Sequence, residues 1–213
     1  MSLNEAANRI TRGAMDFLFP RRCPFCGAET GRDLLCADCR RELPWTGAQA
    51  VTEEDFGLCA APLYEQGKVR KALQDYRDRR HMEALDCFGS LLADCAAQEY
   101  MDRFDTVTWV PSGAQELRRG WDQRRLLAAS FCVDWHTQPV ETLQRKKTGR
   151  LTAVEENVRG RKLLLIDDVC RTGETLRRCT AALQAAGCAG VVCLTLARSG
   201  PGETGTGTKR NQT

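Results

Sequence analysis

Two apolar runs with a helical segment between them constrain the fold of this chain more than any other feature. Residues 162–166 and 191–197 are rich in Leu, Val and Ile, and residues 175–186 repeat apolar side chains at helical spacing before Gly187. A strand, a helix and a strand in this order form a βαβ unit, whose two strands lie parallel. Further segments continue the alternation, with strands predicted at 58–64, 104–111 and 138–143 and helices at 69–76, 85–95 and 123–131. The predicted fold class is α/β, a mainly parallel sheet flanked by helices.

Two aspartates and a polar turn follow the first of these strands. Asp167 and Asp168 stand at its end, and Thr172, Gly173 and Thr175 lie between them and the helix. The start of a helix presents N–H groups that bind anions, and glycine lets a phosphate approach the backbone. Carboxylates instead accept hydrogen bonds from sugar hydroxyls or bind Mg²⁺. A sugar phosphate would satisfy both halves, whereas acids that only cap a strand, or an aspartate that is phosphorylated or binds Mg²⁺ in another α/β fold, are the alternatives.

Four cysteines near the start of the chain have the spacing of a metal site. Cys23 and Cys26 form one CxxC pair and Cys36 and Cys39 another, with nine residues between the pairs. Four thiolates in this arrangement suit a tetrahedral structural Zn²⁺ ion, which stabilises folding rather than catalysing a reaction. A redox pair or an accidental cluster is the alternative. We expect the other eight cysteines to fill the core, because no export signal is recognisable and the predicted compartment is the reducing cytoplasm.

Charge is nearly balanced overall but locally concentrated. The net charge is +3, yet residues 145–162 hold seven Lys or Arg against two Glu. A second basic cluster comprises Arg118, Arg119, Arg124 and Arg125. Such clusters are solvated faces or sites that attract phosphates. No apolar run of about 18 residues is present, so membrane insertion is not expected.

The strand and turn resemble a known motif. LLLIDDVCRTGET (163–175) is similar to the phosphoribosyl pyrophosphate (PRPP) binding motif of type I phosphoribosyltransferases, although Cys170 and Arg171 replace an aliphatic and a small residue. Together with the cysteine cluster, it makes the chain resemble the ComF (competence protein F) family. Further blocks in the same order support this resemblance: Phe19-Pro20-x-x-Cys23, LRRGWDQRRLLA (117–128), ENVRG (156–160) and LTLAR (194–198).

The resemblance implies a set of site residues. Asp167 and Asp168 would hold the ribose hydroxyls of PRPP directly or through Mg²⁺, and Pro111 and Ser112 would approach its pyrophosphate. The turn would wrap the 5′-phosphate with Val169, Cys170, Arg171, Thr172, Gly173, Glu174 and Thr175. A loop predicted at 144–160 would close over the reacting ribose, which makes Lys146 and Lys147 catalytic candidates beside the two aspartates.

The resemblance also implies two functions of different classes. One is transfer of ribose 5-phosphate from PRPP to an acceptor that the sequence does not identify, with release of pyrophosphate. The other is handling of single-stranded DNA during competence, with partners in the competence machinery and a PRPP site that is regulatory or vestigial. A zinc-dependent scaffold that binds neither ligand is a third hypothesis. The segment between ENVRG and the strand at 162 is shorter than is usual in the family, which bears on closure of the loop.

Three regions are predicted along the chain. Residues 1–45 would form an N-terminal helix and a four-cysteine zinc-binding module. Residues 46–198 would form the phosphoribosyltransferase-like domain. Residues 199–213 are rich in Gly and Thr and are predicted to be a disordered tail.

Overall fold

A six-stranded sheet organises the computed structural model, which describes residues 20–78, 82–113, 121–146 and 148–200. Its order is β3-β4-β10-β9-β6, and β5 pairs with β10 beyond the end of β4. All these pairings are parallel except β3 with β4. The strands are β3 (Val51–Glu54), β4 (Gly57–Ala60), β5 (Leu63–Tyr64), β6 (Thr106–Trp109), β9 (Lys162–Cys170) and β10 (Gly190–Arg198). The predicted mainly parallel sheet is therefore confirmed.

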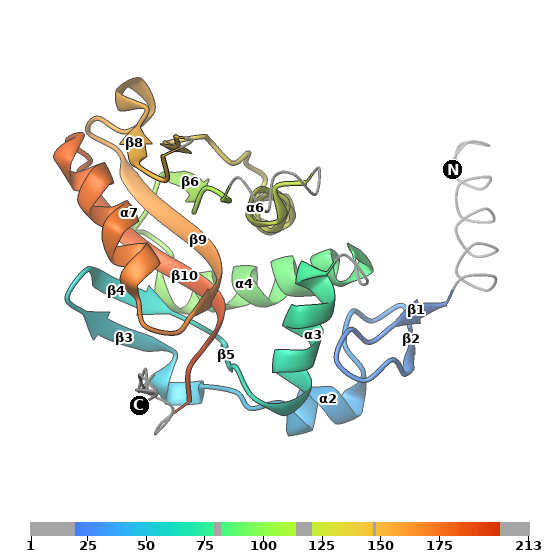
Figure 1. Cartoon of the computed structure of the whole chain (residues 1–213). Helices are drawn as coiled ribbons and strands as arrows, with labels where there is room; N and C mark the ends of the chain where they lie inside the picture. Colours follow the sequence, from blue (N-terminus) through green and yellow to red (C-terminus); the bar gives the residue numbers. More distant parts are fainter. Residues whose placement is uncertain (1–19, 79–81, 114–120, 147, 201–213) are drawn as a thin grey trace, which may run out of the picture.

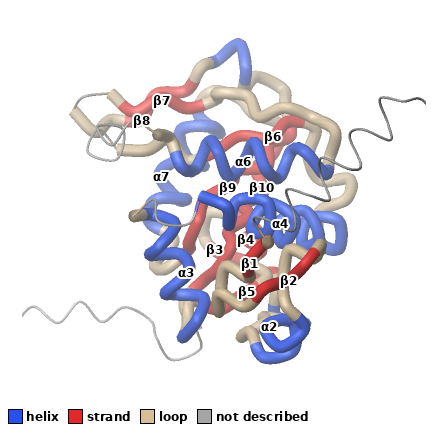
Figure 2. The backbone as a smooth tube through the Cα atoms, turned by 90° about the vertical axis from the view of Figure 1, so that its right-hand side faces the viewer, coloured by secondary structure: helices blue, strands red, loops and turns tan. Residues whose placement is uncertain are grey.

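Helices cover both faces of this sheet. Helix α7 (Glu174–Ala185) packs on one face, and α4 (Leu85–Glu99) and α6 (Gln123–Asp134) pack on the other beside α3 (Gly67–Arg77) (Figure 1). Figure 2 shows α6 and α4 crossing in front of the sheet. Strand β9 has apolar side chains on both faces, with Leu163 and Leu165 in the core beneath α7 and Leu164 and Ile166 in the core beneath α4 and α6. A continuous apolar run is what a central parallel strand needs.

Strand β9 is longer than its apolar run. The sequence predicts a strand that ends at Ile166, but β9 continues through both aspartates to Cys170. The extension forms because β10 remains paired with β9 as far as the Arg198–Cys170 register pair. Asp167 and Asp168 therefore lie within a strand, where backbone pairing fixes their positions.

The loop predicted at 144–160 contains regular structure. Strands β7 (Leu143–Arg145) and β8 (Leu151–Ala153) form an antiparallel hairpin, followed by a 3₁₀ turn η3 (Glu155–Asn157). Leu143 and Val158 are buried in the core beneath α7. These contacts form between segments distant in sequence, so local periodicity does not reveal them. A strand at 138–143 is also absent from the described chain, although the Val140 N–H donates to Val107 O at 2.8 Å.

The cysteine-rich region packs against α3 and α4. It consists of β1 (Arg21–Arg22), β2 (Glu29–Gly31) and α2 (Ala37–Glu42), and the short turns η1 (Gly47–Gln49) and η2 (Met82–Ala84) complete the fold. Phe25 packs against Phe88 of α4 with ring centroids 5.8 Å apart, and Phe88 meets Tyr76 of α3 at 5.6 Å. The cysteine-rich region and the sheet domain therefore share one hydrophobic core.

The cysteines outside the cluster largely behave as expected. Six are buried, namely Cys59, Cys87, Cys95, Cys132, Cys179 and Cys193, whereas Cys170 and Cys188 are partly exposed. The predicted N-terminal helix and most of the predicted tail fall outside the described residues. Within the described ranges, no helix combines the length and apolar character that crossing a membrane requires.

Candidate functional site

Two buried aspartates lie at the centre of the candidate site. Asp167 and Asp168 are only 3% and 5% exposed, although isolated buried carboxylates are strongly unfavourable. They line a cavity of about 300 Å³ together with Arg77, Arg124 and the turn from Val169 to Leu176. The cavity therefore joins the acids and the predicted phosphate-binding turn.

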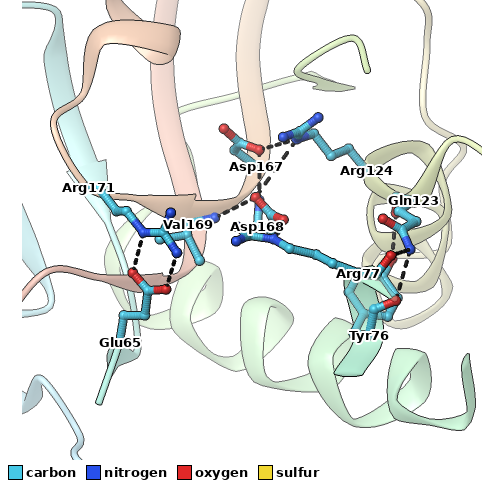
Figure 3. A network of polar contacts seen from close by, with 9 residues as sticks. All are labelled: Glu65, Tyr76, Arg77, Gln123, Arg124, Asp167, Asp168, Val169 and Arg171. Atoms are coloured by element: carbon cyan, nitrogen blue, oxygen red, sulfur yellow. Dashed lines mark hydrogen bonds and ion pairs between the residues drawn. The ribbon is translucent and has the colours of Figure 1, made fainter. Parts of the chain in front are cut away.

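Two arginines from the neighbouring helices neutralise these acids. Arg77 at the end of α3 donates from Nε to Asp168 Oδ2 at 2.6 Å, and Arg124 in the first turn of α6 donates from Nε to Asp167 Oδ1 at 2.6 Å (Figure 3). Backbone N–H groups complete the arrangement, because Asp168 N donates to Asp167 Oδ1 and Val169 N donates to Asp168 Oδ1, both at 2.9 Å. The four side chains form two ion pairs inside the cavity.

The two carboxyl groups have opposite pKa shifts. Burial and then the charge of Asp168 raise the pKa of Asp167 to about 7. Burial acts on Asp168 as well, but the hydrogen bond and charge of Arg77 outweigh it and lower the pKa of Asp168 to about 2. One acid therefore stays ionised while its neighbour titrates near neutral pH.

A reciprocal clamp fixes the helix ends that carry the arginines. The Gln123 side-chain amide donates to Tyr76 O at 2.8 Å and to Arg77 O at 2.9 Å, while the Tyr76 hydroxyl donates to Gln123 O at 2.6 Å. These bonds satisfy carbonyls at the end of α3, which have no partner within the helix. The clamp holds the backbones of Arg77 and Arg124 next to each other on one side of the acids (Figure 3).

The turn between β9 and α7 has the geometry of an anion site. Gly173 adopts the left-handed conformation with φ +69° and stands at the N-cap of α7. A Cβ at this position would lie 2.4 Å from Phe56 Cε1, so the close packing also requires glycine. The first N–H groups of α7 lack carbonyl partners inside the helix, and Thr172 and Thr175 add hydroxyls at the exposed turn.

Arg171 and Glu65 anchor this turn to the rest of the domain. Arg171 donates to Glu65 in a bidentate pair, from Nε at 2.7 Å and from Nη2 at 2.5 Å. The Glu65 side chain is only 5% exposed and follows β5 directly. Arg171, which departs from the family pattern, is therefore bound to a buried acid at the side of the turn.

Pro111 and Ser112 lie after β6, but neither lines the cavity. Ser112 is 3% exposed and donates from Oγ to Asp122 Oδ1 at 2.9 Å, and Pro111 O accepts from Arg145 Nε at 3.2 Å. Asp122 also accepts from Trp109 Nε1 at 3.1 Å and from the Arg125 N–H at 3.2 Å as the N-cap of α6. Asp122 therefore gathers three donors. The pyrophosphate roles of Pro111 and Ser112 stay predictions.

The lysine candidates are not brought to the acids. Lys146 is exposed at the tip of the β7–β8 hairpin and does not line the cavity. Arg178 of α7 contacts the same tip, donating from Nη2 to Gly149 O at 3.5 Å. Lys147 falls outside the described residues. Their catalytic roles stay predictions.

The four predicted metal ligands converge. The sulfur atoms of Cys23, Cys26, Cys36 and Cys39 all lie within 4.8 Å of one another. Tetrahedral Zn–S bonds of about 2.3 Å place sulfurs about 3.8 Å apart, and Cys26 Sγ and Cys36 Sγ are 3.5 Å apart. Burial raises the pKa of the Cys23 thiol, but backbone N–H donors led by that of Cys36 lower it to about 7. The donor set fits a structural Zn²⁺ ion.

Sequence reasoning missed three charged residues of the site. Arg124 belongs to a basic cluster visible in the sequence, and that cluster was the one signal available for it. Arg77 ends α3 and Glu65 directly follows β5, and neither belongs to a motif that the sequence marks as part of the site. Their roles depend on contacts across 91 and 106 positions of the chain.

Two family models match separate parts of the chain. The double zinc ribbon domain matches residues 14–67, and the phosphoribosyl transferase domain matches residues 130–210. The first range includes the four cysteines, and the second includes β9, the turn, α7 and β10. The cysteines are a zinc-binding cluster, and the sheet has the type I phosphoribosyltransferase fold, as the sequence predicted.

Several solved structures are similar to parts of the chain. The allosteric regulatory enzyme of purine biosynthesis is 23% identical over 55% of this chain and 26% of its own, with a TM-score of 0.39. The B. subtilis glutamine PRPP amidotransferase complexed with ADP and GMP is 19% identical over 68% and 35%, with a TM-score of 0.44. A hypoxanthine-guanine-xanthine phosphoribosyltransferase is 19% identical over 56% and 65%, with a TM-score of 0.37. This chain spans less than two thirds of each of these structures, and no curated protein matches it.

Proposed function

We propose that this protein binds PRPP and transfers its ribose 5-phosphate to an acceptor, releasing pyrophosphate. The observation that carries the proposal is the cavity in which two buried acids and the start of α7 face the same space. The phosphoribosyl transferase domain match over residues 130–210 supports the same ligand class. The pairing of the domain with a four-cysteine zinc cluster supports membership of the ComF family.

The two halves of the cavity suit the two ends of a ribose phosphate. The N–H groups at the start of α7 and the hydroxyls of Thr172 and Thr175 would bind the 5-phosphate, since a helix N-terminus carries a partial positive charge. Asp167 and Asp168 would accept hydrogen bonds from the ribose hydroxyls. Gly173 permits the left-handed turn that leads into α7, because glycine adopts its φ of +69° without strain.

Transfer also requires stabilisation of the departing pyrophosphate. Asp167 and Asp168 offer the hard oxygen ligands that Mg²⁺ prefers, and a Mg²⁺ ion bound with PRPP would neutralise charge on the pyrophosphate. Positioned cations of the chain do the same, and they act more strongly in a site that excludes water. The acids of β9 would fix the sugar relative to these cations.

A titration of PRPP with Mg²⁺ tests the proposal directly. The wild type should bind PRPP, and the Asp167→Ala/Asp168→Ala variant should lose this binding while staying folded. Exposed Asp134 at the end of α6 provides a matched control, since Asp134→Ala changes a carboxylate outside the cavity. Wild-type protein that fails to bind PRPP would refute the proposal.

Turnover needs a second measurement. Incubation with PRPP, Mg²⁺ and panels of bases and amines should release pyrophosphate with one acceptor class and not with the Asp168→Ala variant. Release that is equal in the wild type and the variant would show that the acids do not support transfer.

A second candidate function has one observation in its favour. Trp121 is 48% exposed beside the start of α6, where Arg125 lies with its guanidinium carbon 5.9 Å from the Trp109 ring centroid. An exposed aromatic residue beside basic residues suits base stacking with single-stranded DNA, the ligand expected of a protein in competence. Affinity for single-stranded DNA should then fall steeply with salt and decrease in Trp121→Ala. Binding that is absent or independent of salt would reject this function and the competence partners that go with it.

A further inference from the structure

The arginines of the cavity have no role in the binding scheme above. Arg77 and Arg124 line the cavity, yet in the free protein they contact the same carboxylates that a ribose would use. The guanidinium groups therefore occupy Asp168 Oδ2 and Asp167 Oδ1 and line the space that a sugar bound to these acids would enter.

We propose that Arg77 and Arg124 bind the pyrophosphate of PRPP, and that the ribose hydroxyls displace them from Asp168 and Asp167. The proposal rests on the proposed function, and it adds two positively charged residues that act on the leaving group, pyrophosphate. In the free protein the arginines would neutralise the acids. In the complex the same arginines would neutralise the ligand.

The placement of the other anion supports this assignment. The 5-phosphate would occupy the start of α7, so the pyrophosphate on the opposite side of the sugar is the anion left for the arginines. The other arginine that lines the cavity, Arg171, is already bound to Glu65 in a bidentate pair. Arg177 of α7 is similarly bound to Asp55, at 2.7 and 2.8 Å.

The geometry allows the side chains to move while their helices stay fixed. The Gln123 and Tyr76 hydrogen bonds hold the backbones at the end of α3 and the start of α6. The arginine side chains themselves are partly open to solvent, with 31% of Arg77 and 18% of Arg124 exposed. A short rotation about side-chain bonds can therefore transfer each guanidinium from a carboxylate to an incoming phosphate.

The energetics of the exchange are nearly balanced. Guanidinium bonds to carboxylates and to phosphates are both charge-assisted and of similar strength. The arginines also remove a repulsion, because two unpaired carboxylates would disfavour the entry of a ligand with several negative charges. Exchange of partners therefore permits binding without leaving any of these charges buried alone.

The test compares three probes on the wild type and on Arg124→Gln: PRPP, ribose 5-phosphate and inorganic pyrophosphate. The variant should lose about tenfold to a hundredfold in affinity for PRPP and pyrophosphate, the range for lost hydrogen bonds between charged groups. Affinity for ribose 5-phosphate should stay equal or increase, because its hydroxyls no longer compete with Arg124. The adjacent Arg125→Gln is the matched control, since Arg125 does not line the cavity.

The outcomes separate this inference from the proposed function. A wild type that binds neither PRPP nor ribose 5-phosphate would reject the proposed function, whereas pyrophosphate affinity equal in wild type and Arg124→Gln would reject the role of the arginines. Equal weakening of all three probes would also overturn it, because a residue that only supports the fold acts on every ligand. The Arg124→Gln/Asp167→Asn variant removes both charges of the pair, so it keeps the test of pyrophosphate binding valid if the single variant does not fold.

Discussion

Gly173 at the start of α7 is the position where a single methyl group should do the most damage. Its φ is +69°, a left-handed conformation in which a side chain is strained, and a Cβ there would lie 2.4 Å from Phe56 Cε1. Phe56 is 6% exposed and belongs to the core beneath α7. Gly173→Ala therefore combines backbone strain with a clash against a buried ring.

The two contributions can be sized separately. A left-handed conformation costs a residue with a Cβ about 1–2 kcal/mol, and overpacking a buried site costs about 1–3 kcal/mol. Gly173→Ala should therefore lower the free energy of unfolding by about 2–5 kcal/mol, reduced somewhat because alanine has less conformational freedom in the unfolded chain. The clash should also displace the turn between β9 and α7, and this displacement should weaken PRPP binding.

Two other glycines provide matched controls for chemical denaturation. Gly187 has φ +83° and its nearest neighbour, Arg159 Cγ, is 4.0 Å from the added Cβ, so Gly187→Ala isolates the backbone strain. Gly190 has no neighbour within 4 Å of a Cβ and an ordinary φ, so Gly190→Ala should change stability little. Adding Phe56→Leu to Gly173→Ala should restore the stability that is lost to the clash but not the stability that is lost to the backbone strain.

The order of these variants decides the matter. Gly173→Ala should be the least stable variant, followed by Gly187→Ala and then Gly190→Ala. A Gly173→Ala protein as stable as Gly190→Ala would refute it. A double variant in which Phe56→Leu restores no stability would also refute it, because the clash with the Phe56 ring would then be absent.

Three further predictions concern the acids, the cap of α6 and the zinc cluster. Burial and the charge of Asp168 raise the pKa of Asp167 to about 7. The contribution of Asp167 to stability should therefore be fully present below about pH 4 and be lost as the pH rises through about 7. Denaturation across this range should show a decline in the free energy of unfolding that Asp167→Asn lacks. Asp122→Asn puts an amide donor among the three donors that Asp122 accepts, so it should lower the free energy of unfolding by about 1–3 kcal/mol, and an unchanged denaturation midpoint would contradict this. Removal of Zn²⁺ with a chelator should lower the thermal midpoint of the whole domain in one transition, since Phe25 and Phe88 lie in one core; a separate, earlier transition would show that the cysteine-rich region unfolds alone.

Much of the fold could be predicted from local patterns. The apolar run at 162–166 and the helical spacing at 175–186 are strong predictors, because the residues that form each pattern are the ones that face the core. The four zinc ligands could be predicted for a similar reason, since CxxC spacing places two thiolates on one tight turn. The β7–β8 hairpin was missed because Leu143 and Val158 are buried by packing against α7 and β9.

The candidate site was predictable only in part. The acids and the turn are contiguous in sequence, so their chemistry could be recognised together. The predicted strand ended before the two aspartates, whereas β9 includes them. Pairing with β10 holds the aspartates in a strand that their own propensities do not favour. The exposed position of Lys146 could not be predicted either, since it follows from where the hairpin packs.

The sequence by itself determined a parallel α/β sheet, a four-thiolate cluster, and two acids followed by a turn suited to phosphate. Each of these is encoded by residues close together along the chain. Only the tertiary structure decided which charges meet the acids. Arg77, Arg124 and Asp168 come from α3, α6 and β9, and their ion pairs exist because the sheet and its covering helices bring these three elements to one cavity.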